Sequence, residues 1–75
     1  MKVLVVDNED EIRSSVIELI KAFCPDVDEL IEANSVAAGL ESISNNNPDV
    51  VFLDVELGDG TGMDLLSKLS QIKFH

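Results

Sequence analysis

Two aspartates stand directly after two apolar runs of the sequence, and this placement suggests shared chemistry. Asp7 follows the run 3–6, and Asp54 follows the run 50–53. Apolar runs rich in β-branched residues predict strands that are buried on both faces. The carboxyl ends of adjacent parallel strands meet at one edge of a sheet, where ligands bind. Two carboxylates at such an edge repel each other unless a cation or a proton lies between them.

Magnesium is the natural cation for this pair, because Mg²⁺ takes oxygen ligands and keeps several of its waters. An aspartate beside such a metal can act as a nucleophile toward phosphorus. The metal neutralises charge on the transferring phosphoryl group and helps to align it. Asp7 could instead cap a helix, and Asp54 could be an ordinary loop residue. Because both residues follow apolar strands at the point where the strand order reverses, the functional interpretation is favoured.

The rest of the sequence predicts the elements that must hold these residues. A polar run at 29–33 predicts a third strand, and helices are expected between the strands and after the last one. Pro25 ends the first helix, Asn34-Ser35 resembles a cap of the second, and Thr61 with Asp64 resembles a capping box of the third. The apolar stripe expected on the first helix comprises Ile12, Val16, Leu19, Ile20 and Phe23. Leu65, Leu66, Leu69 and Ile72 predict that the third helix continues to residue 72.

Strands that alternate with helices predict an α/β domain with a parallel sheet, joined by right-handed crossovers. The two most apolar strands should be neighbours, and the polar strand 29–33 should lie at an edge. The expected strand order is therefore 2-1-3, with three helices, in one domain that spans residues 1–75. In this order the ends of strands 1 and 3, and with them Asp7 and Asp54, lie side by side.

Composition restricts the possible partners of the chain. The formal net charge is −10, and such an acidic surface repels nucleic-acid phosphates and anionic lipids. We therefore expect no direct nucleic-acid contact through this segment. Cys24 is the only cysteine, which suits a reducing cytoplasm, and its place after an apolar stretch predicts a buried side chain. No apolar run approaches the ~20 residues that span a bilayer, so no membrane contact is expected.

Three stretches of the chain resemble the receiver domains of two-component response regulators. They are Val-Leu-Val-Val-Asp-Asn-Glu near the start, Pro-Asp-Val-Val-Phe-Leu-Asp in the middle, and Asp54-Val-Glu-Leu-Gly-Asp-Gly-Thr-Gly-Met-Asp-Leu-Leu. Among receiver domains, the chain most resembles those of LytR/AlgR-type regulators. The resemblance covers essentially the whole chain. It implies a flavodoxin-like (CheY-like) parallel sheet and a cytoplasmic signalling protein.

The resemblance also implies a role for each site residue. Asp54 matches the phosphoacceptor, which takes a phosphoryl group from a sensor histidine kinase with the help of Mg²⁺. The implied metal ligands are Asp7, Asn8, Asp54 and the backbone carbonyl of Glu56. Asn8 stands where the family usually has a second aspartate. An amide oxygen can coordinate, but it lacks a full charge, so Mg²⁺ affinity should fall.

Further departures concern the last part of the chain. Gly62 matches the glycine at the start of the family's third helix, whereas Gly58 replaces a common proline. Receiver domains have five strands, and this sequence stops after the third helix. The serine or threonine of the fourth strand and the lysine of the fifth are missing, and Lys68 and Lys73 of the predicted third helix are poor substitutes. We therefore expect an incomplete switch and an unpaired strand 50–53 through which the chain self-associates.

Three other functions share some features of this sequence. A flavodoxin-like mononucleotide binder would need hydroxyl and glycine donors after the first strand, whereas this chain offers four polar or acidic residues at 7–10. A phosphohydrolase with an aspartyl nucleophile would favour a second aspartate where Glu56 stands. A receiver-like interaction module that is never phosphorylated, in which Asp54 is vestigial, remains open.

Overall fold

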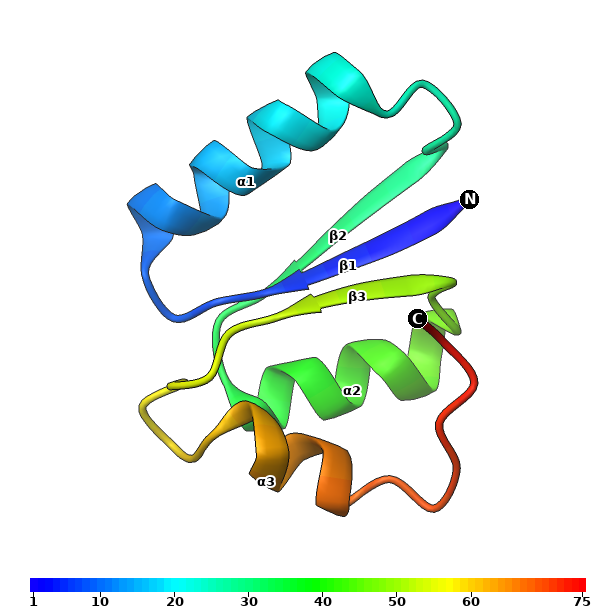
Figure 1. Ribbon diagram of the computed structural model, residues 1–75. Helices are drawn as coiled ribbons and strands as arrows, with labels where there is room; N and C mark the ends of the chain where they lie inside the picture. The colour runs from blue at the N-terminus through cyan, green and yellow to red at the C-terminus, as the bar shows by residue number, and fades with distance from the viewer.

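The computed structural model describes residues 1–75 and forms a three-stranded parallel sheet with helices on both faces (Figure 1). The elements are β1 (Lys2–Val6), α1 (Asp10–Phe23), β2 (Glu29–Ala33), α2 (Val36–Asn46), β3 (Val50–Leu53) and α3 (Gly62–Ser67). The strand order is β2-β1-β3, which confirms the predicted order 2-1-3. None of the helices is long and apolar enough to cross a membrane.

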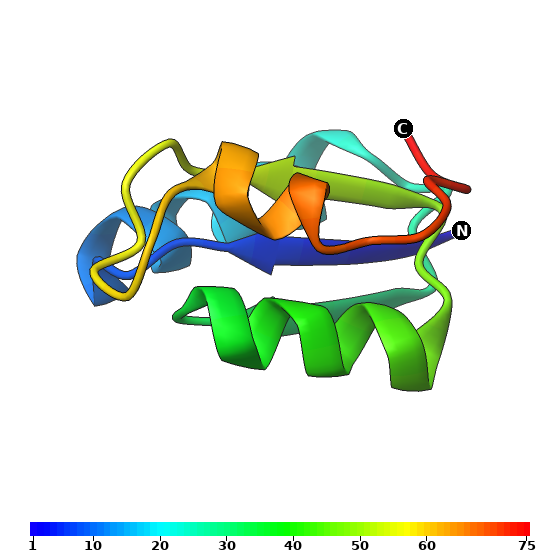
Figure 2. The ribbon, with the colours of Figure 1, turned by 90° about the horizontal axis from the view of Figure 1, so that it is seen from below.

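The register of the sheet places the ends of all three strands level with one another. Val6, the last residue of the central strand β1, pairs with Ala33 of β2 and with Leu53 of β3. The β1–α1 and β3–α3 loops therefore leave the sheet from the same edge, at the left of both ribbon views (Figures 1 and 2). The two chain termini lie at the opposite end.

Alternate residues of β1 supply the two cores of the molecule, because successive side chains of a strand point to opposite faces. Val3 and Val5 pack with Ile17 and Ile20 of α1. The other face packs against α2, α3 and the β3–α3 loop. Its buried residues are Leu4, Val6, Ala33, Val36, Leu57 and Leu65. Asp7 thus follows a strand that is covered on both faces.

The predicted apolar stripe of α1 was wrong in part. Ile20 is buried, but Ile12, Leu19 and Phe23 are exposed, and Ile17, which lay outside the predicted stripe, is buried instead. The side of α1 that carries Val16, Ile17 and Ile20 meets the sheet, whereas Ile12, Leu19 and Phe23 lie outside it. The predicted burial of the cysteine was also wrong: Cys24 is exposed because it caps the end of α1 beyond the residues that pack.

The third helix is shorter than predicted and the chain then returns to the sheet. α3 ends at Ser67, so Lys68 and Lys73 lie outside it, and His75 reaches the outer edge of β3. The His75 amide donates to the Asp49 carbonyl (3.0 Å) and the Val51 amide donates to the His75 carbonyl (2.7 Å). This is the bonding pattern of a parallel ladder. Because His75 makes these two hydrogen bonds, the edge of β3 is not wholly unpaired.

Candidate functional site

Asp7 and Asp54 meet at the carboxyl ends of β1 and β3, as their positions in the sequence predicted. Both line one small pocket of about 180 Å³. Its other lining residues are apolar and come from β1, α1 and β3, namely Val5, Val6, Val16, Phe52 and Leu53. Asp7 is buried, with 7% of its surface exposed, and Asp54 is half-buried. Two carboxylates in one pocket with apolar walls form a place where a cation is stabilised.

The two carboxylates are each held through one oxygen. Asp7 Oδ1 accepts a hydrogen bond from the Glu9 amide (2.9 Å), and Asp54 Oδ1 accepts one from the Val55 amide (2.8 Å). Asp7 is not a helix cap, because α1 begins at Asp10 and its cap residue is Glu9. In each aspartate the second oxygen, Oδ2, is not used by a hydrogen bond within the chain, so it can serve a ligand.

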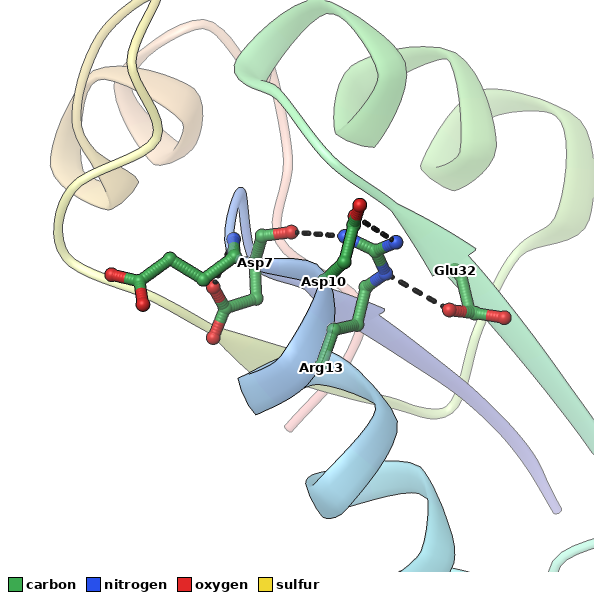
Figure 3. A network of polar contacts seen from close by, with 5 residues as sticks. Asp7, Asp10, Arg13 and Glu32 are labelled. Carbon is green, nitrogen blue, oxygen red and sulfur yellow. Dashed lines mark hydrogen bonds and ion pairs between the residues drawn. The ribbon is translucent and has the colours of Figure 1, made fainter.

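Arg13 fixes the backbone of the buried aspartate, as Figure 3 shows. Its Nη1 donates to the Asp7 carbonyl (2.7 Å), its Nε donates to Glu32 of β2 (2.9 Å), and its Nη2 donates to Asp10 (2.7 Å). The hydrogen bonds to Glu32 and then Asp10 raise the pKa of the Arg13 guanidinium above its ordinary value. This role was not predicted from the sequence, although a single arginine close to several acidic residues was a signal for it.

The β3–α3 loop, residues 54–61, has a defined shape. Glu56 and Thr61 form an antiparallel bridge across the loop, and the Leu57 amide donates to the Gly60 carbonyl (2.9 Å). Leu57 is buried in the core beside α2 and α3, with 2% of its surface exposed. Gly58 and Gly60 have positive φ angles of 83° and 157°, which glycine adopts without the strain that a Cβ would bring. The loop therefore presents the Glu56 carbonyl from a fixed turn.

Asp59 connects this loop to α2, whose first residue lies 23 positions earlier in the sequence. Its Oδ1 accepts a hydrogen bond from the Val36 amide (2.8 Å) and its Oδ2 accepts one from the Ala37 amide (3.2 Å), both in the first turn of α2. The Val36 bond is the main reason that the pKa of the Asp59 carboxyl lies below its ordinary value of 3.8. The sequence analysis assigned this residue only to a turn, since no local pattern indicates a partner 23 residues away.

The remaining predicted ligands lie at the mouth of the site. Asn8 is exposed, and its side-chain nitrogen would lie 3.7 Å from a Cβ placed on Gly58, so it faces the β3–α3 loop. Glu56 is also exposed. No three histidine, cysteine, aspartate or glutamate side chains of the chain gather into a metal-binding group. The expected ligands are the carboxylates of Asp7 and Asp54, the side-chain amide of Asn8 and the backbone carbonyl of Glu56. All four offer oxygen atoms, which are the donors that Mg²⁺ prefers.

Gly62 brings the start of α3 against the end of β3. A Cβ at this position would lie 2.5 Å from the Asp54 carbonyl oxygen and 3.0 Å from Leu53 Cγ. The Gly62 amide also donates to the Val55 carbonyl (2.8 Å). This close approach gives a physical reason for glycine at the position that the sequence analysis singled out.

Comparison with known proteins agrees with this geometry. Residues 3–75 match the family described as the response regulator receiver domain. The chain is 40% identical over 73 residues to the sensory transduction protein LytT of Enterococcus faecalis, and 36% identical over 77 residues to the DNA-binding transcriptional activator DevR/DosR of Mycobacterium tuberculosis. Each alignment covers 97% of this chain, but only 30% of LytT and 35% of DevR/DosR.

The fold is shared with a solved response regulator. The structure of MaeR bound to beryllium trifluoride superposes with a TM-score of 0.84 at 21% identity, over 92% of this chain and 57% of MaeR. The family match over residues 3–75 sets aside the flavodoxin-like nucleotide binder and the phosphohydrolase. A parallel sheet in the order β2-β1-β3, paired aspartates at its carboxyl edge and the match over residues 3–75 lead to one conclusion: the chain belongs to the response regulator receiver domain family of two-component systems.

Proposed function

We propose that Asp54 accepts a phosphoryl group from a sensor histidine kinase, with Mg²⁺ held by Asp7, Asn8, Asp54 and the Glu56 carbonyl. The observation that carries this proposal is the shared pocket of Asp7 and Asp54 at the edge of the sheet. The MaeR response regulator is known bound to beryllium trifluoride, a phosphoryl mimic. We expect the same type of group to lie against Asp54 in this chain.

Asp54 and the Val55 amide have separate roles in the proposed phosphoryl transfer. An oxygen of Asp54 attacks the phosphorus while the Val55 amide holds the other oxygen. The new bond joins this oxygen to phosphorus, and the bond from phosphorus to the kinase histidine breaks. The imidazole keeps the electron pair and takes up a proton. Mg²⁺, when bound, offsets the negative charge that gathers on the phosphoryl oxygens.

The proposal is tested by exposing the full-length protein to a small phosphodonor with Mg²⁺ and measuring its mass. The wild type should gain one phosphoryl group, and Asp54→Asn should gain none. Asp26→Asn serves as the matched control, because it removes the same charge at an exposed site far from the pocket. An unchanged wild-type mass, or an equal gain in Asp54→Asn, contradicts the assignment.

A second candidate is a receiver that is never phosphorylated and acts only as an interaction module. The observation that favours it is Asn8, which offers the metal an uncharged amide in place of a carboxylate. Mg²⁺ binding by the wild type separates the two candidates: a protein that binds no Mg²⁺ at millimolar concentration and gains no phosphoryl group is the interaction module.

The remaining proposals concern the whole protein. The relative DevR/DosR is a DNA-binding transcriptional activator, and we propose a transcriptional output of this kind outside the present segment, in the cytoplasm. The segment itself contacts no nucleic acid, because its net charge of −10 opposes it. We also propose that the present segment self-associates through the part of the β3 edge that His75 leaves open.

A further inference from the structure

The first turn of α2 is capped by two separate parts of the chain. The first four amides of a helix have no partner within it. The Ala38 amide donates to the Ser35 side chain (3.0 Å), whereas the Gly39 amide makes the first regular helical hydrogen bond, to the Ser35 carbonyl (2.9 Å). The Val36 and Ala37 amides instead donate to Asp59, which lies on the β3–α3 loop. Ser35 is therefore a local cap, and Asp59 links two elements.

The loop rests directly on this turn of α2. Leu57 and Val36 belong to the same buried cluster. A Cβ on Gly60 would lie only 3.1 Å from Val36 Cγ2. The loop is seen beyond the carboxyl ends of the strands in Figure 2. Asp59 lies on the same short segment as Asp54, which begins the loop, and Glu56, whose carbonyl is a proposed metal ligand.

We propose that Asp59 is a positioning residue that holds the β3–α3 loop against α2, so that Asp54 and the Glu56 carbonyl stay in place for Mg²⁺ and the phosphoryl group. This inference rests on the function proposed above. The two hydrogen bonds have a charged acceptor, which makes them stronger than neutral ones, and the helix dipole favours a carboxylate at this end. The two glycines beside Asp59 give the loop many alternative conformations once the clamp is removed.

The test compares two caps of the same helix end in the full-length protein. Asp59→Ala and Ser35→Ala each remove a partner of the first α2 amides, and both should lower the melting temperature measured in EDTA. Only Asp59→Ala should weaken Mg²⁺ binding, by about tenfold, as typical for residues that orient metal ligands. It should also slow phosphorylation by the small phosphodonor. Asp59→Asn keeps an acceptor for one amide and should fall between Asp59→Ala and the wild type.

Each outcome decides one question. If Asp59→Ala and Asp59→Asn bind Mg²⁺ as tightly as Ser35→Ala does, the positioning role is wrong and Asp59 is only a cap. Should Asp59→Ala fail to fold, the comparison of Asp59→Asn with Ser35→Ala decides. A wild type that binds Mg²⁺ but gains no phosphoryl group contradicts the proposed function, and the Mg²⁺ comparison still tests Asp59. A wild type that binds no Mg²⁺ overturns both.

Discussion

At the scale of single residues, the site combines a buried aspartate with exposed neighbours. Asp7 is fixed by the Glu9 amide on its carboxylate and by Arg13 on its carbonyl, whereas Asn8 is exposed beside it. An acidic residue at position 8 would add a full charge at the mouth of the pocket. Metal affinity of oxygen sites depends on the number of charged ligands, so we expect the residue at position 8 to set how tightly the proposed Mg²⁺ is held.

Asn8→Asp should therefore strengthen Mg²⁺ binding, by about tenfold, because one unit of charge is added at a proposed ligand position. Isothermal titration with MgCl₂ measures the dissociation constant. Asn45→Asp is the matched control, since it adds the same charge at an exposed position near the end of α2. Equal affinities for Asn8→Asp and Asn45→Asp would show that the Asn8 side chain does not reach the cation.

At the scale of elements, the site depends on how closely α3 approaches β3. The Thr61 side chain accepts from the Asp64 amide (3.1 Å) and the Asp64 side chain accepts from the Thr61 amide (2.8 Å), which confirms the predicted capping box. This capping box fixes the first turn of α3, and Gly62 allows that turn to touch the Asp54 carbonyl. The start of the helix thus supports the backbone of the proposed phosphoacceptor.

Gly62→Ala should destabilise the protein by about 1–3 kcal/mol, because the added methyl group overlaps backbone that cannot move without shifting Asp54. Urea unfolding followed by circular dichroism measures the change. Met63→Ala is the control at the next position of α3, where the side chain is 71% exposed, and its effect should stay within about 0.5 kcal/mol. An unchanged unfolding midpoint in Gly62→Ala would mean that the close contact is relieved by an easy shift.

At the scale of the whole molecule, the sheet ends at β3 on one side. His75 pairs with Val51 and Asp49, but Leu53 lies two residues beyond Val51, and its amide points to the same open side of the strand. Phe52 of β3 is 45% exposed. An edge of this kind, with apolar side chains and unpaired backbone groups, is a template for pairing with a second chain.

The 75-residue chain should therefore show a sedimentation mass that rises with concentration. Phe52→Lys places a charge on the open strand and should reduce this association. Phe23→Lys is the matched control on α1, where the side chain is 76% exposed, and it should associate like the wild type. A monomer mass at every concentration, or an equal reduction in both variants, contradicts pairing through β3.

The sequence by itself determined the parts that depend on short-range signals. The runs 3–6 and 50–53 predicted the buried strands, the polar run 29–33 predicted the edge strand, and the local caps at Ser35 and Thr61 predicted two helix starts. The rule that parallel strands end at one edge then brought Asp7 and Asp54 together. These signals are read within a few residues or follow from strand order, so no tertiary coordinates were needed.

Only the tertiary structure decided which surfaces meet. Periodicity placed Ile12, Leu19 and Phe23 on an apolar stripe of α1. The orientation of α1 on the sheet instead buries Ile17 and leaves those three side chains exposed. α3 ended at Ser67 rather than at residue 72, and the end of the chain paired with the edge of β3. The contacts of Arg13 with Glu32 and of Asp59 with α2 join residues 19 and 23 positions apart. Such contacts depend on how the helices lie on the sheet, which local sequence patterns do not encode.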